Sequence, residues 1–272
     1  MPSVDIHSIA PLDEAAQRSV TDVCANTGLL LLQHGAESAL VESVSRRLGL
    51  ALGVETIEVA LMANGITLTT IMGGRGVTTV RRNQDRGIHM HMVTEVQRIM
   101  LLAEEKKIDL DGVSAGLKSI THAPYKRWQV SVMIGLSCAC FARLNLLAHG
   151  EPMDWGTCGL TFVASAVAMQ VRHYLAHLHF NPLVNFAVAA FVATSIAAQG
   201  TIHHLVANPK LTMSACVLLF VPGFPLINAI SDMVKGYINT GISRGTYAVL
   251  LLFASCVGII LAMTVWNAWN WL

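Results

Sequence analysis

The stretch that decides the fold is residues 245–266, which read GTYAVLLLFASCVGIILAMTVW. It holds no charged side chain, and none follows it up to residue 272. A helix needs about 20 mainly apolar residues to cross a bilayer. This stretch meets that length, and Trp266, Trp269 and Trp271 at its far end are typical of a membrane interface. The sequence therefore predicts a transmembrane helix here.

Four further apolar stretches precede it, which gives five predicted transmembrane helices. They cover residues 128–147, 155–171, 183–199 and 211–230. The second and third are short, so four or six crossings remain open. Residues 128–272 hold three acidic and five basic side chains, against 14 and 13 in residues 1–127. This asymmetry predicts a soluble domain at 1–124 and a transmembrane helical domain at 125–272.

The positions of the lysines and arginines predict the orientation. Cytosolic loops carry an excess of these residues. With five crossings, one side of the membrane holds Lys126, Arg127, Arg172, Lys235 and Arg244, and the other holds Glu151, Asp154 and Lys210. Residues 1–18 are polar and do not resemble a signal peptide. We therefore expect the N-terminal domain in the cytosol and residue 272 outside, with Lys210 as the exception to the rule.

The fourth apolar stretch contains the most unusual pattern, VPGFPLIN at residues 221–228. Two prolines around a glycine remove backbone donors and predict a broken helix. Broken helices at membrane depth often form the binding sites of transporters. An ionisable side chain beside such a break is a candidate functional residue. The predicted substrate-binding residues here are Gly223, Phe224, Asn228, Asp232, Lys235 and Asn239, of which Asn228, Asp232 and Lys235 lie close to one helical face. The alternative is a kink followed by an ordinary cytosolic loop.

Two arginines in the apolar half are the predicted cationic contacts for an anion. Arg143 lies within the first predicted span and Arg172 follows the second. The third span carries many small residues, which let helices approach closely, and we expect it inside a bundle. These residues are Ala187, Ala189, Ala190, Ala193, Ser195, Ala197 and Ala198.

The N-terminal half predicts an α+β domain. Helical spacing of apolar residues covers 12–34 and 37–52, and Gly35 is the expected cap between them. Strand patterns follow at 54–62, 66–72 and 77–81, with Asn64-Gly65 as a hairpin turn and a glycine-rich turn at 73–76. Two more helices are predicted at 88–107 and 109–120.

Several polar groups in the chain permit a catalytic or metal-binding interpretation. They are the pair His34 and Glu37, the pairs His89/His91 and His173/His177, and the cluster Asn83, Asp85 and Arg86. Helix ends and solvated loops explain the same residues, and no hydrolase or zinc motif is present. We expect no enzyme activity, metal or cofactor. The formal net charge of +1 gives no reason to expect a nucleic-acid partner.

Four runs resemble the threonine/serine exporter family when their order and spacing are compared. They are LLQHGAES at 31–38, DRGI at 85–88, GLSCACF at 135–141, and VPGFPLIN at 221–228 followed by Asp232. The resemblance covers the chain from about residue 12 onward. It implies a transporter of a bacterial inner membrane with a cytosolic N-terminal domain. It implies no cofactor and assigns no catalytic residue.

The resemblance also implies a partner. Full-length family members carry ten spans in one chain, whereas the branch closest to this sequence carries five. In that branch a separate membrane protein with five helices supplies the rest, and the pair is associated with succinate export. The expected function is thus one subunit of a succinate exporter. Threonine/serine export, a membrane-bound hydrolase using His34 and Glu37, and an assembly or regulatory subunit remain alternatives.

Overall fold

The computed structural model describes residues 13–62, 64–84, 86–120, 125–206 and 208–271. Its contacts divide the chain into two compact units. Unit 1 holds the described residues up to 120 together with Phe224–Gly245. Unit 2 holds residues 125–223 and those from Thr246 onward. The segment after the proline-glycine break thus belongs to unit 1 by its contacts, although it lies far along the sequence.

A three-stranded antiparallel sheet forms one layer of unit 1. Its strands lie in the order β1 (Thr56–Met62), β2 (Gly65–Met72) and β3 (Arg75–Arg82). Met62 pairs with Gly65, so the predicted hairpin is confirmed and Gly65 belongs to the strand. Gly73 and Gly74 both have positive φ, which a two-residue hairpin turn requires. Because these two residues alone form the turn, β3 begins at Arg75 rather than at residue 77.

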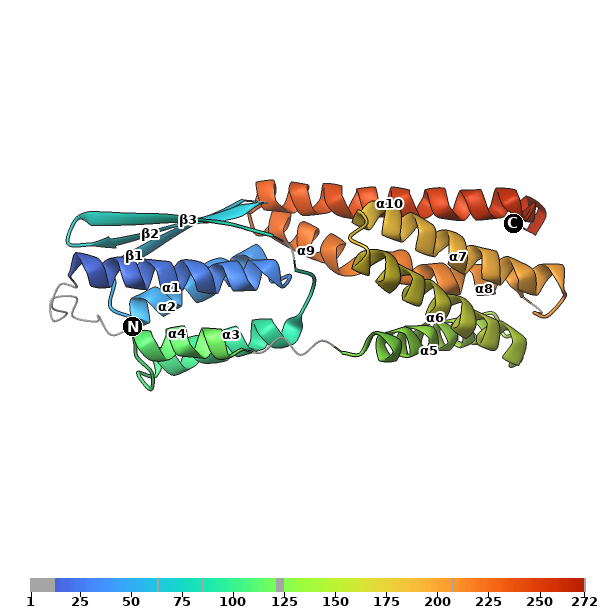
Figure 1. Ribbon diagram of the computed structural model, residues 1–272, viewed down its shortest axis with the longest axis horizontal. Coiled ribbons are helices and arrows are strands. Elements are labelled where there is room, and N and C mark those ends of the chain that lie inside the picture. The colour runs from blue at the N-terminus through green and yellow to red at the C-terminus, as the bar shows by residue number, and fades with distance from the viewer. Residues whose placement is uncertain (1–12, 63, 85, 121–124, 207, 272) are drawn as a thin grey trace. The chain divides into compact units, whose positions relative to one another are not determined.

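Four helices pack with the sheet in unit 1, and the predicted α+β pattern is confirmed. They are α1 (Glu14–Gln33), α2 (Ser38–Ala51), α3 (Met90–Glu104) and α4 (Leu110–Ser119). Figure 1 shows α1 running along the strands, where it contacts β2 and β3, while α2 contacts β1. Gly35 follows α1 with a φ of +86°, the conformation expected of a helix-ending glycine. The core gathers apolar side chains that are 0 to 1% exposed, among them Leu31, Val41, Val44, Leu48, Ile66, Leu68 and Val96.

A helical hairpin completes unit 1. It consists of α9 (Gly223–Val234) and the first residues of α10 (Ile238–Val265). Gly236 has a φ of +92° and allows the chain to turn between the two helices. A Cβ atom on Gly241 would lie 2.7 Å from the Ala229 carbonyl oxygen, so the helices approach closely here. α10 begins seven residues before the predicted start at Gly245 because its first two turns pack in unit 1.

Unit 2 is a helix bundle of α5 (Arg127–Ala148), α6 (Trp155–His177), α7 (Pro182–Ile202), α8 (Pro209–Val217) and the rest of α10. Two short 3₁₀ helices, η2 (Leu218–Phe220) and η3 (Ala268–Trp271), end its segments. The helix breaks at Val221 and Pro222, between η2 and α9, as the prolines predict. The bundle position of α7 is confirmed, since Ala189, Ala190, Ala193, Ala197 and Ala198 are fully buried.

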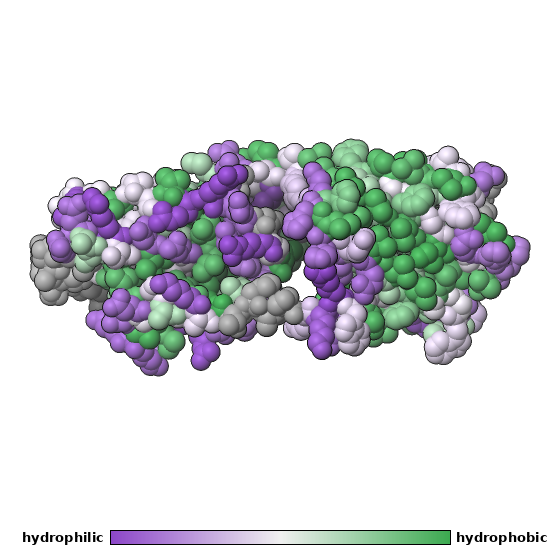
Figure 2. Space-filling model, in the orientation of Figure 1, coloured by the Kyte–Doolittle hydropathy of each residue, from purple (hydrophilic) through white to green (hydrophobic). Residues whose placement is uncertain are grey.

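Within the described residues, three helices are long and apolar enough to cross a membrane. They are α5, residues Pro182–Gly200 of α7, and α10. Figure 2 shows hydrophobic residues over much of the visible face of unit 2, whereas hydrophilic residues gather over unit 1. The protein is therefore a helical membrane protein that also carries a small three-stranded sheet.

Candidate functional site

Asp232 lies at the centre of a buried polar cluster of unit 1, which we call the Asp232 network (Ser38, Asp232, Arg244 and the Ala36 carbonyl). Its carboxylate is 0% exposed. The Ser38 N–H donates to Oδ1 at 2.8 Å, and the Ser38 hydroxyl donates to Oδ2 at 2.9 Å. Arg244 donates from Nη1 to Oδ2 at 2.7 Å and from Nη2 to the Ala36 oxygen at 2.9 Å. The buried carboxylate is thus both hydrogen-bonded and charge-compensated.

Asp232 acts as a helix cap in this network. Ser38 is the first residue of α2, and the first N–H groups of a helix have no partner within it. The N-cap residue Glu37 makes no capping bond with its side chain. That carboxylate instead forms an ion pair with Lys235 of the segment after α9. Asp232 of α9 therefore caps α2 with its side chain, which the adjacent residue Glu37 does not do.

The three side chains that were predicted to share one face, two from α9 and one just after it, all contact the segment from Gly35 to Ser38. Asn228 donates from Nδ2 to the Gly35 oxygen at 2.8 Å. Asp232 binds Ser38, and Lys235 pairs with Glu37. The common face is confirmed. Asp232 forms its ion pair with Arg244.

Two further groups at this contact have shifted pKa values. The hydrogen bond from Lys235 lowers the pKa of Glu37, against a smaller opposing effect of burial. Tyr237 donates its hydroxyl to Glu42 of α2. Burial, with that hydrogen bond as a second cause, raises the pKa of Tyr237 to about 12. Both shifts favour the contacts as they stand at neutral pH.

The remaining predicted residues of this region are less connected. Gly223 begins α9, and a Cβ atom there would meet nothing within 4 Å. Phe224 and Asn239 are exposed at the starts of α9 and α10. Their role in substrate binding stays a prediction. For Asn228, Asp232 and Lys235, a substrate would have to displace an existing partner on α2 or the loop before it.

Sequence reasoning missed Arg244 as a member of this cluster and treated it only as a loop charge. The sequence did contain a signal for this contact, because the turn of a helical hairpin brings residues on its two sides together. Asp232 and Arg244 flank the turn at Gly236, and α9 and α10 are antiparallel around it. Ser38 carried no signal, because its partner lies 194 residues away in the chain.

The two predicted arginines of unit 2 lie in a different environment. The Arg172 guanidinium lies 4.2 Å from the centre of the Phe186 ring, which is a cation–π contact between α6 and α7. The Nη1 atom of Arg143 on α5 is buried and has no hydrogen-bond partner in the described part of the chain. Among the described residues, neither arginine forms an ion pair with a carboxylate. Both are thus cations that an anionic substrate could compensate.

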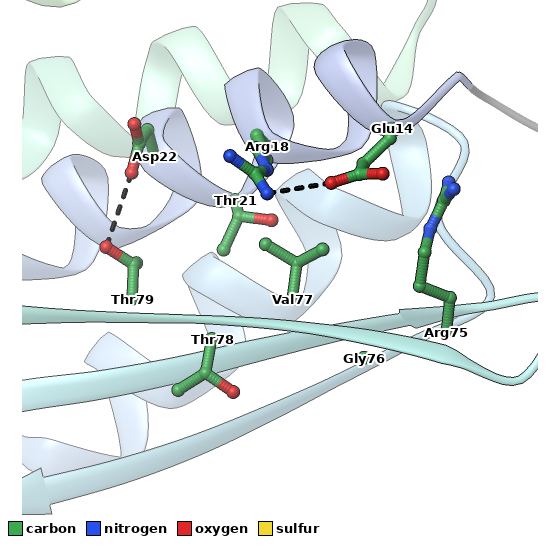
Figure 3. A pocket seen from close by; sticks show the side chains of 9 residues that line it. All are labelled: Glu14, Arg18, Thr21, Asp22, Arg75, Gly76, Val77, Thr78 and Thr79. Carbon is green, nitrogen blue, oxygen red and sulfur yellow. Dashed lines mark hydrogen bonds and ion pairs between the residues drawn. The ribbon is translucent and has the colours of Figure 1, made fainter.

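A polar cavity of about 430 Å³ lies between α1 and β3 of unit 1. Figure 3 shows two interactions among its side chains: Arg18 with Glu14, and Asp22 with Thr79. Asp22 also accepts a hydrogen bond from Arg81 at 2.7 Å. Arg75 donates to the side-chain oxygen of Gln17 at 2.9 Å, so each charged side chain of the cavity already has a polar partner.

Of the groups that suggested catalysis, three histidines lie near one another: the ring centres are 6.2 Å apart for His34 and His89 and 6.1 Å apart for His89 and His91. The His34 Nδ1 atom lies 2.8 Å from the Leu30 oxygen, and Glu37 pairs with Lys235. His89 accepts a hydrogen bond from the Met92 N–H and caps α3. Among the described residues, no three His, Cys, Asp or Glu side chains are grouped to hold a metal. Asp85, predicted in a cluster with Asn83 and Arg86, lies outside the described residues.

Fold and site define a helical membrane protein with unpaired cations in its bundle, and comparison with known proteins gives the family. A family model described as "Putative threonine/serine exporter" (ThrE) matches residues 22–266. The chain therefore belongs to the threonine/serine exporter family, as the sequence runs indicated. No solved structure matches the chain.

Several curated proteins are similar to the chain. It is 49% identical to the "Probable succinate transporter subunit YjjP" of Klebsiella aerogenes, over 95% of this chain and 98% of that protein. It is 49% identical to the protein of the same name from Escherichia coli K12, over 94% and 98%. It is 23% identical to the "Probable threonine/serine exporter" of Mycobacterium tuberculosis, over 93% of this chain but 47% of that protein.

Proposed function

We propose that this protein is one subunit of an exporter that moves succinate, a small dicarboxylate, across the bacterial inner membrane. A YjjB-type membrane protein with five helices supplies the other half of the hetero-oligomer. The observation that carries the proposal is the 49% identity to two proteins named as succinate transporter subunits, over 95% and 94% of this chain. Similarity of this extent includes both units rather than one shared domain.

The need for a partner is supported by chain length. The alignment covers 93% of this chain but only 47% of the mycobacterial relative. The part of that relative outside the alignment is long enough for a second bundle. The word "subunit" in the names of the two closer relatives agrees with a divided transporter.

We assign five crossings to the chain. The helices α5, α7 and α10 are apolar enough to span. The 23 residues of α6 give a length of about 34 Å, which exceeds a hydrocarbon core of about 30 Å. The segment α8–η2, which leads into α9 of unit 1, is the fourth crossing in this assignment. The loop charges then favour a cytosolic N-terminal domain.

Arg172 is the first residue that we assign to succinate binding. At neutral pH succinate is a dianion, since carboxyl groups of this kind have pKa values well below 7. A guanidinium binds a carboxylate through two parallel hydrogen bonds. Arg172 and Arg143 have no carboxylate partner in the described residues, whereas Lys235 and Arg244 are paired. We assign the second carboxylate to Arg143 or to a cation of the partner.

Efflux of labelled succinate from proteoliposomes tests the proposal. We expect flux when both chains are present and none with either chain alone. Arg172→Gln should lower the flux at least tenfold, because a charge-assisted bidentate contact is lost. Arg98→Gln, which removes an exposed arginine of α3, is the control and should leave flux unchanged. Succinate flux that is equal in Arg172→Gln and wild type would contradict the assignment of Arg172.

Threonine/serine export is the second candidate, favoured by the family description. A zwitterion needs an anionic group for its ammonium in addition to a cation. Asp232 is the carboxylate predicted for that role, but Arg244 and Ser38 already occupy it. The same vesicles loaded with labelled threonine decide between the two. Flux of threonine without flux of succinate would overturn the substrate assignment.

A further inference from the structure

One buried face of α6 carries hydroxyl side chains among small and apolar ones. Thr157, Thr161 and Ser165 follow at four-residue steps, and each is 0% exposed. Arg172 lies two turns beyond Ser165 on the same face, and Asp154 caps the start of the helix. From Asp154 to Arg172 this face measures about 27 Å, at about 1.5 Å per residue, close to the thickness of a bilayer core.

A buried hydroxyl of α7 lies at the level of the middle of this face. Two contacts fix how the helices pack: Arg172 lies over Phe186, and a Cβ atom on Gly200 would meet Leu160 at 2.1 Å. The helices are therefore antiparallel, and Thr194 lies at the level of Ser165. Thr194 is also 0% exposed. We call Thr157, Thr161, Ser165 and Thr194 the hydroxyl lane.

The two hydroxyls in the middle of the lane are unpartnered. Neither Ser165 Oγ nor Thr194 Oγ1 has a hydrogen-bond partner within the described residues. Other buried hydroxyls of unit 2 donate to their own helix, as Ser131 does to Arg127 at 3.1 Å and Ser255 to Leu251 at 3.0 Å. Hydroxyls that hold helices together would bond to the neighbouring helix. Those of Ser165 and Thr194 do not, and a buried polar group without a partner costs free energy.

Resting on the proposed function, we infer that the hydroxyl lane lines the path of the transported carboxylate, with Arg172 as the contact at one end. Hydroxyl groups donate hydrogen bonds to carboxylate oxygens without adding a fixed charge. An anion could therefore leave Arg172 and move along the lane without binding too tightly to be released. Polar side chains inside membrane bundles commonly mark such paths. This role also explains why α6, despite its length, is not among the helices apolar enough to be counted as spans.

Flux through variants of the lane tests the inference in the complete complex. Ser165→Ala and Thr194→Val remove hydroxyls with little change in volume, and we expect each to lower succinate flux at least tenfold. Ser255→Ala is the matched control, since Ser255 is equally buried in unit 2 but bonds to its own helix. It should keep wild-type flux. Wild-type flux in both lane variants would overturn the inference.

Thiol labelling provides a readout that does not depend on flux. Ser165→Cys should react with a water-soluble, membrane-impermeant methanethiosulfonate faster than wild type, and succinate should slow that reaction. Ser255→Cys should show only the wild-type background of the six native cysteines. If Ser165→Cys also shows only that background, the lane is dry and the inference is wrong. If wild type moves no succinate but Ser165→Cys is labelled, the proposed function fails while the water-accessible lane stands.

Discussion

Asp232 caps a helix to which it does not belong. Its carboxylate receives two hydrogen bonds from Ser38 and one from Arg244, and it has no exposed surface. A buried carboxylate is tolerated only when charge and hydrogen bonds compensate it. The structural role is therefore well supported at this residue, and any role in transport would have to work through or against these contacts.

Replacing Asp232 tests how strongly the network holds unit 1 together. Asp232→Asn leaves Arg244 without its counter-charge in a site where the arginine side chain is 19% exposed. Breaking a buried pair costs about 3–5 kcal/mol, and we expect a fall in the unfolding midpoint of roughly 5–10 °C. Thermal unfolding of the detergent-solubilised protein measures it.

Lys235→Ala is the control for this prediction. It breaks the ion pair with Glu37, which is partly exposed on both sides, and exposed pairs contribute about 0–1 kcal/mol. The midpoint should change little. Equal falls in the unfolding midpoint of the two variants would show that the buried Asp232 pair contributes no more to stability than the partly exposed Lys235 pair. A loss of succinate flux in Asp232→Asn without any thermal shift would instead favour direct binding of substrate.

At the scale of the elements, glycines determine how closely the helices pack. α10 contacts α7 at Gly258, where an added Cβ atom would lie 2.0 Å from the Ala187 oxygen and 3.0 Å from the Phe191 nitrogen. Both obstacles are backbone atoms and cannot rotate away. Small residues at such points allow close approach in membranes, where no hydrophobic effect drives helices together.

Gly258→Ala should therefore separate α10 from α7 and destabilise unit 2. We expect a marked loss of monodisperse protein in detergent gel filtration and a lower unfolding temperature. Gly159→Ala on α6 is the matched control, because an added Cβ there meets nothing within 4 Å. Alanine has a helix propensity about 1 kcal/mol better than glycine, so this control should be neutral or stabilising. A stable Gly258→Ala variant would contradict the packing described here.

The distribution of charge is the main guide to topology at the scale of the whole molecule. Lys126 precedes α5 and Arg127 begins it, and Arg172 lies near the end of α6, whereas Glu151 and Asp154 lie in the loop between these helices. The charged N-terminal half then lies on the side of the positive loops. This asymmetry favours five crossings over an even number, since an even number would return residue 272 to the positive side.

Fusions to alkaline phosphatase, which needs an oxidising compartment to form its disulfides, test this topology. We expect activity for fusions after Glu151 and after Asn267, and none after His179. The first two positions follow an odd number of crossings in the five-span assignment, and the third follows an even number. Phosphatase activity of the fusion after His179 would show that α6 does not cross the membrane. A transport path along α6 would then have no basis.

Much of the fold follows from local pattern. The elements of the N-terminal half were predicted within a few residues because helix and strand periods, Gly35 and the Gly73-Gly74 turn are short-range signals. The break near Pro222 was predictable for the same reason, since proline acts on its own backbone. The extension of α10 to Ile238 was not, because polar residues near Asn239 resemble a loop until their packing against α9 is known.

By itself the sequence determined that half of this chain lies in lipid, that an α+β domain precedes it, and which family it belongs to. These properties rest on composition, periodicity and ordered motifs, which need no knowledge of contacts. Only the tertiary structure decided that Asp232 bonds to Ser38 and Arg244, and that Thr194 lies at the level of Ser165 in the bundle. Such pairings join residues far apart in the chain, and neither spacing nor residue type specifies them until the helices pack.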